Sequence, residues 1–340
     1  KKMQMISGIH YNFSFGNEMI NYLYGKFGEG KDKRLFIDEI HFGLARNFLR
    51  YSWILIYLFG ASPFCHSSYY PVIKKEFMLI QKCCPDPGNI IKNCLQYATS
   101  LRVSRFGYSN SLKNENIYFN SLKEYSTKMH RMLSTRDEEY SKLGIYSNGS
   151  QIQLNGNVLQ KESEFYSLIR LKQPIRNGET PLDALEKRGV NYVEVRILDL
   201  NPFQKLGLTM DQMHFLHVFM HFCLFEQSPP INDQEHDLIN LNHHLVSLTG
   251  RQKDLSLKKY DGSKISLKSW GAEIFEKLKK IADLMDNSTA NNKYSACVET
   301  EHQKLLDISL LPSEMINLEM KENNENFLEF GIKYAKKNAK

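Results

Sequence analysis

The chain has 340 residues, of which 42% are hydrophobic and 24% are charged, and its formal net charge is +6. This composition is typical of a soluble globular protein with one large domain or two ordinary ones. The basic residues are dispersed and no basic motif is interleaved with aromatic residues, which argues against a nucleic-acid partner. The longest apolar run, residues 53–60, is far shorter than the ~20 residues of a membrane helix. Six cysteines without a CxxC motif indicate reduced thiols and a cytoplasmic location.

The first predicted element is a strand near the start of the chain, within residues 4–15. Hydrophobic and polar residues alternate there with a period of two, which is typical of a strand with one buried face. The hydrophobic side carries Ile9, Tyr11, Phe13 and Phe15, and the polar side carries Gln4, Gly8, His10, Asn12 and Ser14. The polar side either faces water or forms the floor of a site, and the pattern alone leaves both readings open.

A long helix is predicted next, over residues 38–59. Hydrophobic residues recur there at steps of three and four, namely Leu44, Phe48, Tyr51 and Leu55. Gly60 is expected to end this helix. Residues 66–96 are predicted to be irregular, residues 101–104 to form a short strand, and residues 118–142 to be mainly helical.

The second half of the chain alternates short strands with helices and then becomes mostly helical. Strands are predicted over residues 151–154, 165–171 and 191–200, with a short helix over residues 181–187 before the last of them. Residues 209–335 are predicted to be mostly helical. Strands among helices, without a regular βαβ order, indicate an α+β fold with an antiparallel sheet.

Five residues on or near these strands could carry chemistry. Glu194 and Arg196 point the same way from one strand, about 6.6 Å apart, where a carboxylate could bind a cation and a guanidinium could bind phosphate. An exposed ion pair is the alternative. Arg102, with Tyr108 nearby, could bind the carboxylate of an amino-acid substrate. The alternative is that Arg102 is an ordinary surface arginine. Tyr166 is expected to be a half-buried strand tyrosine.

A group of three histidines is expected to be structural. His214, His217 and His221 share one face of a predicted helix, a spacing that could bind zinc. The segment is otherwise apolar, however, and it has no acidic neighbours that would orient the imidazoles. We therefore do not expect a metal at this helix.

Five ordered blocks resemble the bacterial glutamate–cysteine ligase family of the proteobacterial type. The blocks read ISGIHYNFSF, LFGASPFC, YATSLRVSRFGYSN, NVLQKESEFYSLIR and YVEVRILDLNPF. The resemblance extends from the first residues to about residue 254. It implies a fold related to glutamine synthetase, with a curved antiparallel sheet whose polar face holds Mg²⁺, ATP and glutamate. The polar side of the first strand would then be the floor of a site.

The resemblance also implies roles for individual residues. His10 and Glu194 correspond to metal ligands, and Arg196 to the residue that contacts the nucleotide phosphates and acts in catalysis. The implied substrate-binding positions are Gln4, Ile6, Arg102, Tyr108 and Tyr166, of which Arg102 would bind a substrate carboxylate and the two tyrosines would line the cysteine subsite.

The implied reaction is ATP-dependent ligation of the glutamate γ-carboxylate to the cysteine amine through a γ-glutamyl phosphate, the first step of glutathione biosynthesis. Mg²⁺ (or Mn²⁺) and ATP would be required, in a cytoplasmic enzyme that is expected to be a monomer. A ligase of the same fold with another amine acceptor, and an inactive truncated copy, are the alternatives.

The sequence departs from the family at its start. Most of the family's metal-binding carboxylates come from an acidic amino-terminal segment, for which we find no counterpart. We therefore expect residues 1–205 to form an incomplete catalytic domain, with residues 206–340 as a mostly helical region packed on it. A chain of this kind is expected to lack ligase activity by itself.

Overall fold

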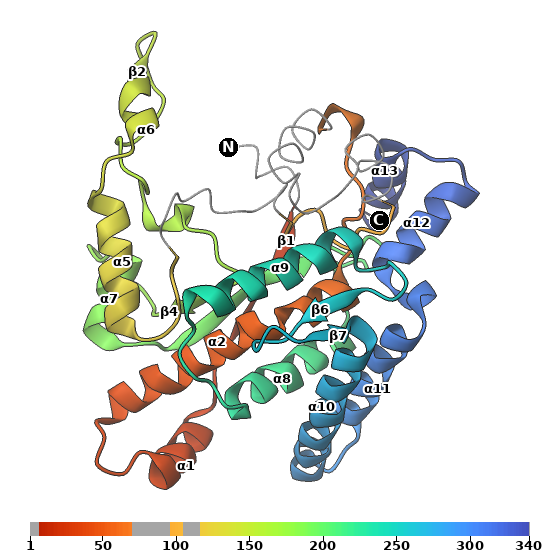
Figure 1. Ribbon diagram of the computed structural model, residues 1–340, viewed down its shortest axis with the longest axis horizontal. Helices are drawn as coiled ribbons and strands as arrows, with labels where there is room; N and C mark the ends of the chain where they lie inside the picture. Colours follow the sequence, from red (N-terminus) through yellow and green to blue (C-terminus); the bar gives the residue numbers. More distant parts are fainter. Residues whose placement is uncertain (1–6, 70–95, 105–115, 340) are drawn as a thin grey trace.

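The computed structural model of the protein describes residues 7–69, 96–104 and 116–339 (Figure 1). Within these residues, the largest sheet has three antiparallel strands in the order β1 (Gly8–Phe13), β5 (Tyr192–Asp199) and β4 (Ile169–Lys172). Two short hairpins are formed by β2 (Tyr146–Ser147) with β3 (Ser150–Gln151), and by β6 (Ser256–Lys258) with β7 (Lys264–Ser266). The antiparallel sheet among helices confirms the predicted α+β class.

Helices make up most of the rest of the described chain. In chain order they are α1 (Asn17–Phe27), α2 (Lys33–Phe59), α5 (Leu122–Ser134), α6 (Glu138–Leu143), α7 (Pro181–Arg188), α8 (Met210–Phe225), α9 (Asp233–Thr249), α10 (Leu267–Thr289), α11 (Lys293–Leu306), α12 (Pro312–Glu322) and α13 (Phe327–Asn338). Short 3₁₀ turns lie at Ser67–Tyr69, Glu162–Glu164 and Ile308–Leu310. None of the described helices is long and apolar enough to cross a membrane.

Helix α2 is the central element of the fold. It ends at Phe59, before Gly60, as predicted, but it begins at Lys33 rather than at residue 38. The side chain of Asp32 caps this end by accepting a hydrogen bond from the backbone N–H of Leu35, which adds a turn that the hydrophobic pattern did not indicate. Strands β4 and β5 pack against α2. Helices α8 and α9 also lie along α2 (Figure 1).

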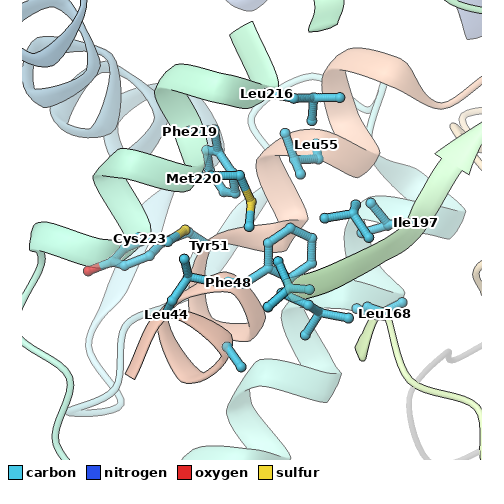
Figure 2. Close-up of a cluster of buried hydrophobic side chains, with 14 of the residues drawn as sticks. Leu44, Phe48, Tyr51, Leu55, Leu168, Ile197, Leu216, Phe219, Met220 and Cys223 are labelled. Carbon is cyan, nitrogen blue, oxygen red and sulfur yellow. The ribbon is translucent and has the colours of Figure 1, made fainter. Parts of the chain in front are cut away.

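The main hydrophobic core lies between α2, α8 and the sheet. Figure 2 shows side chains from all three meeting there: Leu44, Phe48, Tyr51 and Leu55 from α2, Leu168 and Ile197 from the sheet region, and Leu216, Phe219, Met220 and Cys223 from α8. One buried cluster therefore contains residues from both sides of position 205. Because the sheet buries only one face against this core, its other face can carry polar groups.

Some predicted strands were wrong in extent or kind. Residues 101–104 form no strand; Ser100 makes an isolated bridge with Ser62, and the backbone N–H groups of Thr99 and Ser100 donate to the Ser247 carbonyl of α9. The strand predicted over residues 151–154 is the two-residue β3, and the one predicted over residues 165–171 is β4, four residues long and displaced toward its carboxyl end. The hairpin β6–β7 interrupts the region predicted to be mostly helical.

Candidate active site on the polar face of the sheet

The strand register places a row of polar residues across the open face of the sheet. Asn12 of β1 pairs with Glu194 of β5, and Glu194 pairs in turn with Arg170 of β4. In the next row Lys172 pairs with Tyr192. The neighbours of Glu194 along β5 turn the other way, toward the core, so this face collects charged groups from all three strands.

A β-bulge determines how His10 meets β5. Ile9 pairs with Leu198 and Tyr11 pairs with Val195, so two residues of β5, Arg196 and Ile197, lie opposite His10 alone. An extra residue of this kind redirects side chains at the rim of a sheet. The Nε of Arg196 consequently donates to Nε2 of His10 at 3.4 Å.

Glu194 lies at the centre of the charged cluster. Its Oε1 atom is 3.6 Å from Nδ1 of His10 and 3.2 Å from Nε of Arg196, and its Oε2 atom is 3.6 Å from Nζ of Lys172. The carboxylate is mostly buried, with 14% of the side chain exposed, whereas 51% of the His10 side chain is exposed. The structure therefore brings together three residues that the sequence singled out, His10, Glu194 and Arg196.

The cluster has an excess of positive charge. Lys172 and Arg196 pair with the carboxylate of Glu194, and a third cation, Arg170, lies opposite Glu194 on β4. The guanidinium of Arg170 donates to the backbone carbonyl groups of Ser163 and Phe165. Partial burial and the Arg196 guanidinium lower the pKa of His10, so its imidazole is neutral at neutral pH. Burial, followed by repulsion from Arg196, also lowers the pKa of Arg170. Such a surface attracts anions.

Arg196 carries a donor that no described residue uses. Its Nη1 atom is buried and has no hydrogen-bond partner among the described residues, and its guanidinium lies over the ring of Tyr166, 5.4 Å from the ring centre. A buried donor without a partner costs free energy, which a bound anion would recover. The contact with the aromatic ring favours this orientation of the guanidinium.

Arg102 lies in the interior behind this cluster. Its side chain is 3% exposed; Nε donates to Asp199 at 2.6 Å and Nη2 donates to the backbone carbonyl of Arg196 at 3.1 Å. Asp199 also accepts hydrogen bonds from Ser62 Oγ and from the backbone N–H of Ala61. This network stabilises the bulge, because Arg102 bonds to the backbone of Arg196 within it. The predicted contact of Arg102 with a substrate carboxylate stays a prediction.

Tyr166 was expected to be a half-buried strand tyrosine, but it is buried and precedes β4. Three further predicted residues and two that were not predicted remain. Gln4, Ile6 and Tyr108 lie outside the described residues. Arg170 and Lys172 were missed, although they alternate with Ile169 and Leu171 in the same way as Glu194 and Arg196 alternate with core residues. That alternation would have placed both cations on the polar face.

Two groups in the cluster have the chemistry of metal ligands. A carboxylate and a neutral imidazole, from Glu194 and His10, approach within 3.6 Å. The described residues contain no group of three histidine, cysteine, aspartate or glutamate side chains placed to hold a metal ion. A metal at this position would therefore take its other ligands from phosphate, water or further parts of the protein.

The three histidines of α8 are half-buried and pack against aromatic rings of neighbouring elements. His217 and His221 contact the ring of Phe13, and the rings of His214 and His217 contact Tyr294. Burial and the two neighbouring imidazoles lower the pKa of His217 to about 4. These contacts make the histidines part of the packing between α8, β1 and α11.

Comparison with known proteins assigns the family. The family model described as glutamate–cysteine ligase matches residues 1–246. The glutamate–cysteine ligase of Clostridium acetobutylicum is 58% identical over 337 residues, which are 98% of this chain and 70% of the relative. That of Pseudomonas entomophila is 36% identical and covers 100% of this chain and 62% of its own length.

A solved structure agrees with this result. A glutamate–cysteine ligase from Francisella tularensis, in complex with AMP, superimposes with a TM-score of 0.81 and 31% identity, covering 99% of this chain and 64% of that one. The chain thus spans about two thirds of the length of the relatives it matches. Family match, identity and fold agree, and the chain belongs to the glutamate–cysteine ligase family.

Proposed function

We propose that the polar face of the sheet binds the phosphates of ATP and that the whole protein joins glutamate to cysteine, the first step of glutathione biosynthesis. The observation that carries this proposal is the pairing of Lys172 and Arg196 with the one carboxylate of Glu194, with the buried Nη1 of Arg196 left without a partner among the described residues. The family membership supports the same reaction, and the AMP complex of a relative supports the nucleotide.

The reaction has two steps that this face would serve. The side-chain carboxylate of glutamate attacks the γ-phosphorus of ATP, ADP leaves, and a γ-glutamyl phosphate remains. The cysteine amine then attacks the acyl carbon, loses a proton, and inorganic phosphate leaves. Both steps place negative charge on phosphoryl oxygens, which Arg196 and Lys172 would neutralise while they orient the phosphate.

His10 and Glu194 would hold a Mg²⁺ or Mn²⁺ ion on this face. The carboxylate is a suitable ligand for either ion, and the lowered pKa of His10 keeps its imidazole unprotonated. A bound ion would neutralise phosphate charge beyond what the side chains achieve. Tyr166, together with Arg102 and the predicted residues Gln4, Ile6 and Tyr108, is proposed to shape the amino-acid subsites.

Substitution of Glu194 and Arg196 in the full-length protein tests the proposal. Glu194→Gln keeps the size of the side chain but removes its charge, and Arg196→Lys keeps the charge but loses the planar two-point contact. We expect each to lower the rate of cysteine-dependent ADP release by about a hundredfold or more. The urea midpoint should stay near that of the unaltered protein.

The exposed carboxylate of Glu273 supplies the matched control. Glu273 pairs with Lys259 on the surface, and its side chain is 53% exposed. Glu273→Gln should keep full activity. If Glu194→Gln also turned over at a near-normal rate, Glu194 and Arg196 would be an ion pair with only a structural role and the proposal would be wrong.

A further inference from the structure

A protruding arm carries a concentration of exposed hydrophobic side chains. The arm, residues 137–157, contains α6, β2 and β3, and it projects from the body of the molecule beyond α5 (Figure 1). Among the described elements, β2 and β3 pack mainly on each other. Five large hydrophobic side chains of the arm are between 41% and 66% exposed, namely Leu143, Ile145, Tyr146, Ile152 and Leu154.

The conformation of the arm is fixed by its own backbone and side chains. Asn148 and Gly149 both have positive φ angles, 49° and 77°, as the tight two-residue turn of a hairpin requires. The side-chain amide of Gln153 donates to two carbonyl groups at the end of α6. At the base of the arm, the backbone N–H of Asp137 donates to the carbonyl of Gly156. The hydrophobic surface is therefore formed before any partner binds.

Exposed hydrophobic side chains lie on both faces of the hairpin. The backbone N–H of Ile152 donates to the carbonyl of Ile145, so these two residues are opposite each other and share one face. Tyr146 belongs to the next pair, with Gln151, and lies on the other face. Because the arm stands away from the body, a partner can reach both faces (Figure 1).

The arm lacks the features that normally prevent exposed strands from pairing with other chains. Residues 143–160 contain no aspartate, glutamate, lysine, arginine or proline. Within the described chain, β2 and β3 each have one neighbouring strand, so the outer edge of each is open. Proteins usually protect such edges with charges, with proline or with a covering element. A neutral, hydrophobic surface selects a partner that is likewise neutral and hydrophobic, and it does not attract charged ligands.

The area of this surface fits a second copy of the chain. A half-exposed side chain of this size presents about 100 Å², so the five together present roughly 500 Å². Two copies that cover each other's arms would remove about 1,000 Å² from water, the size at which specific interfaces begin. A smaller partner, such as a short peptide, would leave part of the surface exposed.

We propose that the arm is the contact surface of a homodimer, in which the β2–β3 hairpins of two copies pack on each other about a two-fold axis. A second copy carries the same neutral surface and the same open strand edges, so each arm can cover the other. The inference concerns a surface apart from the polar face of the sheet and does not depend on the proposed function. It differs from the monomer that we expected from the sequence.

Sedimentation velocity of the full-length protein tests this inference. An interface of this size is at the weak end of specific contacts, so we expect a monomer–dimer equilibrium between roughly 1 and 100 μM protein. Because the surface is uncharged, the dimer should persist in about 0.5 M NaCl, where contacts between exposed charges are screened.

Two substitutions in the arm should weaken the dimer. Ile152→Glu places a carboxylate at the contact in both copies, and Tyr146→Ser removes the largest of the exposed side chains. We expect each to raise the dissociation constant of the dimer by about tenfold or more. Both side chains are exposed, so the urea midpoint should stay near that of the unaltered protein.

Leu328→Glu is the matched control. Leu328 is 52% exposed and Ile152 is 51% exposed, but Leu328 lies in α13, away from the arm (Figure 1). This variant should dimerise as the unaltered protein does. A full-length protein that stays monomeric up to about 100 μM would overturn the inference. A dimer that Ile152→Glu and Tyr146→Ser form as readily as Leu328→Glu would also overturn it, because the contact would then lie elsewhere.

Discussion

Gly8 shows how a single absent side chain allows the site to form. A Cβ atom at this position would lie 2.5 Å from Cζ of Arg102, 2.6 Å from its Nη1, and 2.7 Å from the carbonyl oxygen of Leu198. Arg102 cannot easily move, because it is buried and paired with Asp199. The close approach of β1 to this guanidinium therefore requires glycine.

Replacement of Gly8 by alanine is expected to destabilise the fold. We expect Gly8→Ala to lower the free energy of unfolding by about 1–3 kcal/mol, the usual cost of adding an atom to a closely packed region. Gly25→Ala is the control, because Gly25 lies inside α1 with no atom within 4 Å of its added Cβ. That change should stabilise the helix slightly. Urea denaturation that ranked the two variants equally would contradict the packing argument.

At the level of elements, the sequence predicted the two strands that carry the site, β1 and β5, but not the bulge in their pairing. Period-two alternation predicted β1 and β5 and assigned His10, Glu194 and Arg196 to polar faces. The bulge opposite His10 depends on how two distant strands pair, which local alternation does not encode. The same alternation was present at Arg170 and Lys172, but β4 was predicted too early in the chain.

The segment 96–104 was predicted to contain a strand because short-range patterns do not show tertiary partners. Its backbone is instead held by α9 and by Arg251, which donates to the carbonyl groups of Gln96 and Ala98. This arrangement carries Arg102 to Asp199 at the end of β5. A buried ion pair between segments about a hundred residues apart is a consequence of the whole fold and has no local signature.

Loss of the charge on Asp199 should therefore destabilise the protein strongly. Asp199→Asn leaves the buried Arg102 without its anionic partner, and removal of one member of a buried pair costs about 3–5 kcal/mol. Glu273→Gln, which breaks an exposed pair with Lys259, should cost less than about 1 kcal/mol. Chemical denaturation of both variants checks this. A cost for Asp199→Asn as small as that of the control would mean that neutral hydrogen bonds hold Arg102 equally well.

At the scale of the whole molecule, the folded state keeps several histidines neutral. Burial lowers the pKa of His41 in α2, of His221 in α8 and of His243 in α9, so the effect extends over the helices on both sides of the core. For His243 the folded pKa is about 4, and its Nε2 donates to the carbonyl of Val103 at 2.6 Å. Each such group binds a proton more readily once the chain unfolds.

Stability should therefore fall as the pH is lowered through the range between the two pKa values. An unfolded histidine has a pKa of about 6.5, so between pH 6.5 and 4 the unfolded chain binds more protons than the folded one. The stabilisation that comes from a neutral His243 is fully present above pH 6.5 and is lost as the pH falls toward 4. It amounts to roughly 3 kcal/mol, at about 1.4 kcal/mol per pKa unit.

His243→Gln separates this contribution from the other titrating groups. The glutamine amide can still donate to Val103 but does not titrate, so the variant should lose part of the pH dependence of unfolding between pH 6.5 and 4. His66→Gln changes an exposed histidine and should keep the full dependence. Urea titrations at half-unit pH steps measure both slopes. Equal slopes in the two variants would mean that His243 takes up no additional proton on unfolding, and that α9 is not held to residues 96–104 by a neutral imidazole.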